Sequence, residues 1–345
     1  MNTSIAPRRA LLLPLCALLI SAFAPTIQAG VTDLSTQPLA TMPKVKAKPN
    51  LLFVLDDSGS MEWSWMPDDL GYRNRSGDYV PYNWVGYRSS QCNGLAFDPT
   101  QPYPPPLKAD GTSYPDATYP RAKDDGYVDS SSTTDLSSSY YYTYSGTETK
   151  MGWTYATGDV DTSSKFYEQC SRSPSTPGAE FTKVNVSSLP AEDRQRYANW
   201  YSYYSRRYLL MRTAMGRAIT ALDSGYRVGF STIHDTEALD GSTSYSSNPL
   251  GYFRDVKDFD STQKARFNDS LYKSKPGGGT PLREALSKAG QYFAYKAPKQ
   301  SYDPVQYSCQ RNYTLLSSVG YWNGDKGTQL DVKTYIGQQD DTEVR

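Results

Sequence analysis

Two carboxylates and two hydroxyls follow directly on an apolar run near the start of the chain. The stretch LLFVLDDSGSMEW (51–63) places Asp56, Ser58 and Ser60 at alternate positions, with Gly59 between the serines. A turn can point such residues toward one place, and glycine lets another backbone come close. Carboxylate and hydroxyl oxygens suit Mg²⁺ or Mn²⁺ better than Zn²⁺. The alternative is an ordinary strand-ending turn held by Asx or Ser hydrogen bonds.

A third hydroxyl, that of Thr280, follows three consecutive glycines and precedes Pro281. Thr is a good helix N-cap and Pro suits the first helical position, which offers a purely structural explanation. Capping does not explain the three glycines, which predict a loop without side chains that can bring Thr280 onto a cation. The stretch is not a phosphate-binding P-loop, because the lysine that precedes Ser/Thr in that motif is absent.

These side chains need a sheet to position them. The run NLLFVLD (50–56) is continuously apolar, as in a strand buried on both faces of a parallel sheet. A long helix is expected from about 189, with Ser188 as its cap and Pro190 in its first turn. Its buried stripe runs through Tyr197, Tyr201, Tyr204, Tyr208, Met211, Met215, Ile219 and Leu222.

Further elements alternate in type toward the end of the chain. We expect a strand (226–233), a hairpin with a Gly/Ser turn (236–259), a helix (261–274), a helix with Leu282, Leu286, Ala289 and Phe293 on one face, and a buried strand (312–322). This order predicts an α/β fold with a doubly wound, mostly parallel sheet. Ligands of such sheets bind at the carboxyl ends of the strands, where Asp56, Ser58 and Ser60 emerge.

Residues 62–187 interrupt this order as a long insertion rich in Tyr, Ser, Gly, Pro and Asp, with nearly half of the 30 tyrosines. We expect a few short strands and no second hydrophobic domain. The aromatic stretch 140–144 fits either an ordinary loop or a patch that contacts a carbohydrate or another surface.

Export is expected from the first residues. Arg8 and Arg9, an apolar stretch and Ala29 before Gly30 resemble a secretory signal over 1–29, the alternative being a retained anchor. A polar leader would span 30–48 and the domain 49–345. Removing the signal leaves 34 basic against 36 acidic residues, a charge of −2, which argues against a nucleic-acid partner.

Few residues remain for other chemistry. Cys92, Cys170 and Cys309 allow one disulfide and one leftover thiol, with the pairing open. A single histidine, His234, argues against a Cys/His zinc site, and we expect it to be a satisfied residue at a strand end. The sequence has no G-x-S-x-G elbow, so we expect no enzyme.

The motifs FVLDDSGSM and GGGTPLREAL resemble the von Willebrand factor A domain with its metal-ion-dependent adhesion site. With CNGLAFDPTQPYPPPL and CQRNYTLLSSVGYWNG, the stretch from about 50 to 325 is similar to the PilY/PilC family of type IV pilus tip-associated proteins. The resemblance implies that Ser58, Ser60 and Thr280 contact Mg²⁺ (or Mn²⁺ or Ca²⁺) directly and that Asp56 holds it through water, while Asp57 adds negative field. A partner's carboxylate would complete the cation's coordination.

The same resemblance implies a cell-surface location at the pilus, with the periplasm and outer membrane on the way. Expected partners are pilus components such as minor pilins, and a ligand on a host or abiotic surface. The chain would act in pilus biogenesis and adhesion.

Two departures from the family pattern weaken the site. Val319 stands where the family has an outer carboxylate, a loss that typically costs about 10–100-fold in metal affinity, and Asp325 is a possible substitute. The family's C-terminal β-propeller is absent, so we expect an A-like domain incomplete at its C-terminus, from a fragment or a truncated gene. The alternative function is a structural pilus component that binds no metal.

Overall fold

A four-stranded sheet in the order β10-β1-β8-β9 organises the residues that carry the candidate site. In this computed structural model the described residues are 47–149, 161–234, 253–298, 300–318, 322–323 and 326–337. The expectations for the signal, most of the leader, the hairpin turn, Val319 and Asp325 lie outside these ranges. The strands are β1 (Asn50–Leu55), β8 (Arg227–Thr232), β9 (Phe253–Asp258) and β10 (Asn312–Ser317).

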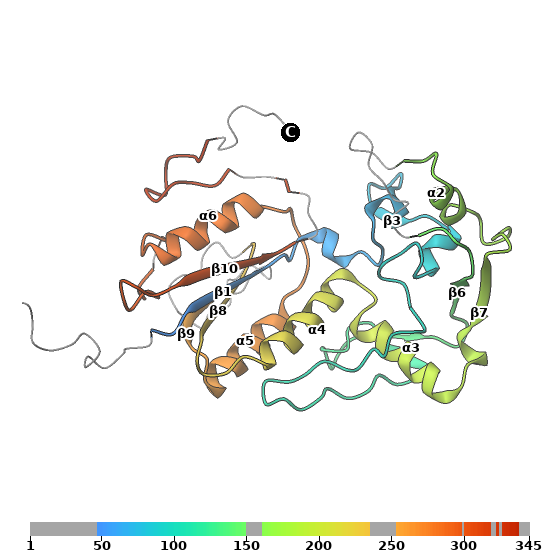
Figure 1. Cartoon of the computed structure of the whole chain (residues 1–345), viewed down its shortest axis with the longest axis horizontal. Coiled ribbons are helices and arrows are strands. Elements are labelled where there is room, and N and C mark those ends of the chain that lie inside the picture. The colour runs from blue at the N-terminus through green and yellow to red at the C-terminus, as the bar shows by residue number, and fades with distance from the viewer. Residues whose placement is uncertain are drawn as a thin grey trace, which may run out of the picture. The chain divides into compact units, whose positions relative to one another are not determined.

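Helices cover both faces of this sheet. Successive side chains of β1 point to opposite faces, and both sets are apolar, so each face needs a covering layer. Leu52 and Val54 pack with Ala289 of α6 (Leu282–Phe293) on one face. Leu51 and Phe53 face α4 (Arg207–Thr220) and α5 (Ser261–Lys273) on the other. Figure 1 shows α6 on one side of the strands and α4 and α5 on the other. The expected α/β class is therefore confirmed.

The sheet differs from the expectation at its two edges. β1 pairs in parallel with β8 and β10, whereas β9 runs antiparallel to β8. The final strand is not buried, because it forms an edge: Tyr313 and Leu315 are 49% and 54% exposed. On α6, Leu286 is also exposed and Ala285 lies on the buried face instead.

The single long helix expected from 189 is two helices, α3 (Ala191–Tyr203) and α4. The backbone N–H of Arg207 donates to the carbonyl of Trp63 at 3.1 Å rather than continuing α3. Ser188 is not the cap: its hydroxyl donates to the carbonyl of Asn185, and Pro190 precedes α3 without a side-chain cap. The break separates two cores, because α3 packs in the insertion and α4 packs on the sheet.

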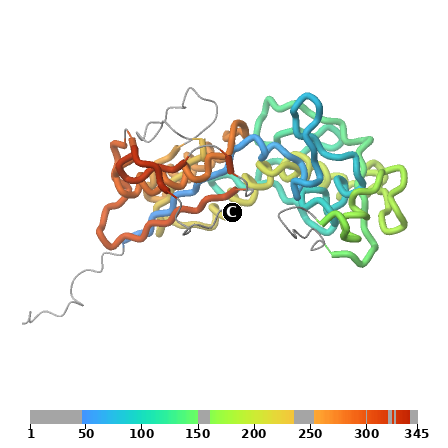
Figure 2. The backbone as a smooth tube through the Cα atoms, turned by 90° about the horizontal axis from the view of Figure 1, so that it is seen from above, coloured from blue at the N-terminus to red at the C-terminus, as the bar shows by residue number. Residues whose placement is uncertain are grey.

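The described residues of 62–206 are here called the insertion body, and the rest of the described residues the sheet body. Figure 2 shows the chain leaving the sheet after β1 and returning to it in α4. The regular elements of the insertion body are β2 (Gly71–Arg73), β3 (Tyr79–Pro81), β4 (Arg121–Lys123), β5 (Thr133–Asp135), β6 (Tyr140–Tyr144), α2 (Lys165–Cys170), β7 (Phe181–Asn185) and α3, with short 3₁₀ turns between them. The pairs β2–β3, β4–β5 and β6–β7 are antiparallel.

Contrary to the expectation, the insertion body holds buried clusters of its own. One gathers Phe97, Tyr141 and Tyr197, and another surrounds Val85 and Phe166. A disulfide between Cys92 and Cys170, 78 positions apart in the sequence, lies within the second cluster. Cys309 is free and exposed. The disulfide therefore ties the insertion to itself and not to the sheet.

No described helix combines the length and the apolar character that would be needed to cross a membrane.

Candidate metal centre

The loop after β1 and the glycine-rich loop after α5 are joined backbone to backbone. The N–H of Gly59 donates to the carbonyl of Gly278 at 3.1 Å, and the N–H of Gly277 donates to the carbonyl of Asp57 at 2.8 Å. The loop after β1 lies at the carboxyl end of a parallel strand, as expected for a ligand site of such a sheet. The structure thus brings the segment of Ser58 and Ser60 against the segment that carries Thr280.

The two serine hydroxyls face each other. Ser58 Oγ and Ser60 Oγ are 3.1 Å apart, and Ser58 is fully buried. Neighbouring ligands of an octahedral Mg²⁺ at about 2.1 Å are separated by about 3.0 Å, so this spacing fits a pair of cation ligands. It fits a plain hydroxyl–hydroxyl hydrogen bond equally well, which is the turn-like alternative.

Asp56 holds the loop rather than pointing away from it. Its Oδ1 accepts from the backbone N–H of Ser58 at 2.9 Å, and its Oδ2 accepts from the hydroxyl of Ser318 at 2.8 Å. Ser318 directly follows β10, so the carboxylate links the ends of two neighbouring strands. A carboxylate with both oxygens engaged in this way suits an outer role, contacting a cation through water.

Thr280 is nearly buried, and a third segment fixes its backbone. Its N–H donates to Asn323 Oδ1 at 2.7 Å, and the N–H of Asn323 donates back to the carbonyl of Thr280 at 3.1 Å. Asn323 therefore fixes both the N–H and the C=O of the residue that carries the hydroxyl.

The glycines have structural reasons at this contact. Gly278 has a φ of +70°, which residues with side chains rarely adopt. A Cβ at position 59 would lie 3.3 Å from the carbonyl oxygen of Gly278, and one at position 279 would lie 2.7 Å from Asn323 Oδ1. The glycines thus permit close approach of three segments, where the sequence suggested a freely swinging loop.

Next to Ser58 in the sequence, the buried Asp57 forms an acid–base pair with the partly buried His234. His234, just after β8, has Nδ1 2.7 Å from Asp57 Oδ1. Burial raises the pKa of Asp57 more than the hydrogen bond from His234 lowers it. Burial alone would lower the pKa of His234, but the hydrogen bond to Asp57 and the charges of Asp57 and Asp56 raise it overall. The negative charge of Asp57 is therefore partly balanced by the hydrogen bond from His234.

The sequence names Asp56, Ser58, Ser60 and Thr280 as candidate ligands, and the structure adds the residues that hold their segments in place. Ser318 and Asn323 lie in the stretch SSVGYWNG, which also contains Val319 and directly precedes Asp325. No cluster of three or more His, Cys, Asp or Glu side chains suited to a metal occurs in the described ranges. A cation at these strand ends would therefore depend on hydroxyl ligands.

Comparison with known proteins gives similarity to three curated relatives, each described as a type IV pilus biogenesis factor PilY1 of Pseudomonas aeruginosa. The chain is 31% identical to the strain PAO1 protein over 332 residues, 32% to that of strain UCBPP-PA14 over 326 and 30% to that of strain PAK over 338. Each match covers 90% of this chain and about a quarter of the relative, 26%, 26% and 27% respectively. No family model and no solved structure matches the chain.

Proposed function

Because the chain belongs to the PilY1-type family of type IV pilus biogenesis factors, we propose that it takes part in pilus biogenesis and surface adhesion at the pilus. The proposal includes a von Willebrand factor A-like fold with residues 62–187 inserted after the first strand. Its mechanism is binding: a divalent cation held at the strand ends anchors an acidic group of a partner. Minor pilins and a ligand on a host or abiotic surface are the proposed partners.

One observation carries the mechanism: the backbone contact between Gly59 and Gly278, which sets the serine loop against the Thr280 loop. Hydroxyls from two separate loops then supply direct ligands, and Asp56 contributes through water. Open coordination positions remain for the carboxylate of a partner, and a charge-assisted bond to that carboxylate supplies the attachment.

The alternative is a structural pilus component that binds no metal. It is favoured by the fact that Ser58 and Ser60 satisfy each other and that both oxygens of Asp56 have protein partners. Such a loop is stable without a cation. Val319 in place of an outer carboxylate points the same way.

Titration calorimetry with Mg²⁺ and Mn²⁺ separates the two. We expect heat from the wild-type chain, at least about tenfold weaker binding for Ser60→Ala, and stronger binding for Val319→Asp, since an outer ligand typically contributes about 10–100-fold. The matched control is Ser175→Ala, because Ser173 Oγ and Ser175 Oγ form an exposed pair at 2.8 Å with the same spacing in sequence. No heat from either the wild type or Val319→Asp would leave the structural alternative.

A genetic test addresses the pilus role separately. Deleting the gene should reduce surface pili, and the wild-type gene should restore them. If Ser60→Ala restores pili but not adhesion, the cation serves adhesion alone. Unchanged pili after deletion would exclude a role in biogenesis.

A further inference from the structure

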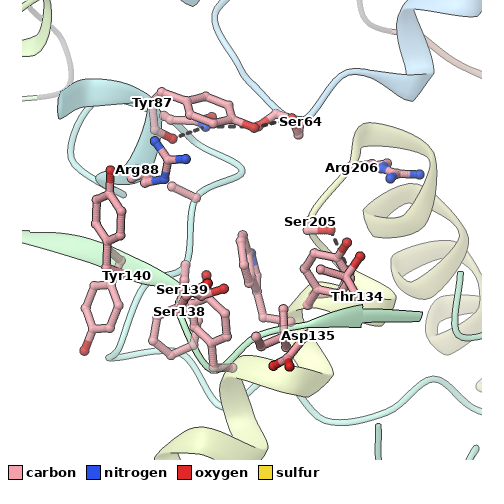
Figure 3. A pocket seen from close by; sticks show the side chains of 18 residues that line it. Ser64, Tyr87, Arg88, Thr134, Asp135, Ser138, Ser139, Tyr140, Ser205 and Arg206 are labelled. Atoms are coloured by element: carbon pink, nitrogen blue, oxygen red, sulfur yellow. Dashed lines mark hydrogen bonds between the residues drawn. The ribbon is translucent and has the colours of Figure 1, made fainter. Parts of the chain in front are cut away.

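A cavity of about 440 Å³ lies in the insertion body, and none of the four candidate cation ligands lines it. Its wall comes from Ser64 and from parts of three segments, 87–97, 134–141 and 197–206 (Figure 3). Small-molecule sites fall in the range of about 300–1,000 Å³ and combine aromatic walls with a few polar groups. The size and the mixed lining are those of a binding site for a small ligand.

The aromatic part of the wall is already fixed. Phe97 packs edge-on against Tyr141 and Tyr197, with ring centroids 5.0 Å apart in each case. Trp200 donates its Nε1–H to the carbonyl of Leu95 at 2.9 Å. Asn93 secures the same loop, because its side-chain amide donates to the carbonyls of two other lining residues, Ser64 and Tyr87. A ligand would meet a preformed surface and would lose little affinity to ordering it.

The polar groups are divided between two sides. On one side Arg88 stacks over the rings of Tyr140 at 4.8 Å and Tyr87 at 5.4 Å. Within the described ranges no carboxylate lies at ion-pair distance from its guanidinium. Figure 3 shows Asp135 and Thr134 on the opposite side of the cavity. One side therefore offers the Arg88 guanidinium, and the other offers the Thr134 hydroxyl and the Asp135 carboxylate. Arg206 also lines the cavity, but it pairs with Glu62 at 3.5 Å.

We propose that this cavity binds an acidic sugar at the end of a glycan. The sugar carboxylate pairs with Arg88, whose planar fork matches a carboxylate. The C–H face of the ring lies on the aromatic wall that includes Tyr197 and Trp200. Sugar hydroxyls donate to Asp135, which accepts from the backbone N–H of Ser137 at 2.9 Å and has further acceptor positions. Asp135 is exposed at the rim, which leaves an exit for the rest of the glycan.

Two simpler ligands use only part of this lining. A neutral sugar would leave the Arg88 guanidinium without an anionic partner. A small carboxylate would leave the aromatic wall in contact with water. The acidic sugar is the ligand that engages both sides and the wall between them, and it draws on the aromatic stretch 140–144 that the sequence singled out.

The test is binding of three probes to the full chain by calorimetry. The probes are methyl glucuronide, whose capped anomeric oxygen mimics a chain end, methyl glucoside as its neutral counterpart, and acetate as a carboxylate without a ring. We expect methyl glucuronide to bind at least about tenfold more tightly than either of the others, since a charge-assisted hydrogen bond is stronger than one between neutral groups. Equal binding of acetate and methyl glucuronide, or no binding of the glucuronide at millimolar concentration, overturns the proposal.

Variants locate the binding in this cavity. Arg88→Gln should weaken methyl glucuronide at least about tenfold and leave methyl glucoside unchanged, which removes the discrimination. Asp135→Ala should weaken both sugars by a similar factor. Arg194→Gln is the matched control, because Arg194 also stacks on a tyrosine, Tyr119 at 5.4 Å, but lies outside the cavity. Circular dichroism checks that each variant is folded. Undiminished discrimination in folded Arg88→Gln contradicts the assignment.

Discussion

The sheet body and the insertion body reach a buried interior by different means. In the sheet body, aliphatic and phenylalanine side chains alternate along β1 and fill two layers, with Leu52 on one face and Phe53 on the other. In the insertion body, tyrosine and tryptophan rings do much of the packing, and their polar ends bind loop carbonyls. Tyr203 Oη donates to the carbonyl of Pro115 at 2.9 Å, and Trp200 Nε1 donates to that of Leu95 at the same distance.

The difference shows what a loop-rich region needs in order to be buried. Its carbonyls have few strand or helix partners, and buried carbonyls without partners are costly. A loop-rich region needs apolar surface to bury and donors for its carbonyls. Aromatic side chains with a polar end supply both, because they bury a ring and donate a hydrogen bond to a carbonyl. The abundance of tyrosine therefore reflects the scarcity of regular secondary structure in the insertion body.

The largest expected effect is at the junction of the two bodies. Arg212 on α4 is 1% exposed, and its Nη1 pairs with Asp125 Oδ2 of the insertion body at 3.0 Å. Arg212→Ala should cost about 3–5 kcal/mol of unfolding free energy, because it leaves a largely buried carboxylate unpaired. Denaturant titration measures this loss. Arg266→Ala, at an exposed site on α5, is the control, and an equal loss there would contradict the prediction.

A somewhat smaller effect should distinguish the two bodies. Replacing Cys92 and Cys170 together by alanine opens a covalent loop that spans 78 positions and should cost about 3–4 kcal/mol. The loss should fall on the insertion body, so hydrogen exchange should quicken in β6 and β7 far more than in β1 and β8. Cys309→Ala should change neither, because this cysteine is free and exposed. Uniform quickening throughout the chain would mean that the two bodies unfold as one.

The smallest effect is alkaline sensitivity, to which buried tyrosines of both bodies contribute, Tyr208 of the sheet body among them. Burial raises the pKa of Tyr103 and of Tyr204 to about 12 each. The unfolded chain loses these protons near pH 10 while the folded chain keeps them, so stability should fall as pH rises from about 10 to about 12. Tyr204→Phe should flatten this fall, and Tyr335→Phe, at an exposed site, should not. Denaturant midpoints measured across that pH range test it.

The sequence predicted the sheet body better than the insertion body for a physical reason. The apolar run of β1 and the spacing of α5 and α6 report burial directly, since alternation and helical periodicity follow from backbone geometry. Leu286 and Leu315 were misplaced because exposure at an edge depends on what lies beside it. The break before Arg207 was missed because it comes from a distant partner, the Trp63 carbonyl, and no local signal marks it.

The candidate site shows the same division. Asp56, Ser58, Ser60 and Thr280 could be named as candidates because carboxylate and hydroxyl residues after an apolar run or a glycine run are visible in the sequence itself. Their supports, Asn323 and the pair of Asp57 with His234, depend on how separate segments meet. Pairwise contacts of this kind leave no periodic signal in one sequence.

The contact between Trp63 and Arg207 also has a mechanical consequence. The chain enters and leaves the insertion body at neighbouring points, held by the Arg207 N–H at 3.1 Å from the Trp63 carbonyl and by its guanidinium on the Trp65 carbonyl. Tension applied along the backbone from outside must pull this neck apart before it reaches the long segment between the two points. These contacts therefore keep tension from reaching the insertion body. The force needed to break them determines when the aromatic region begins to extend.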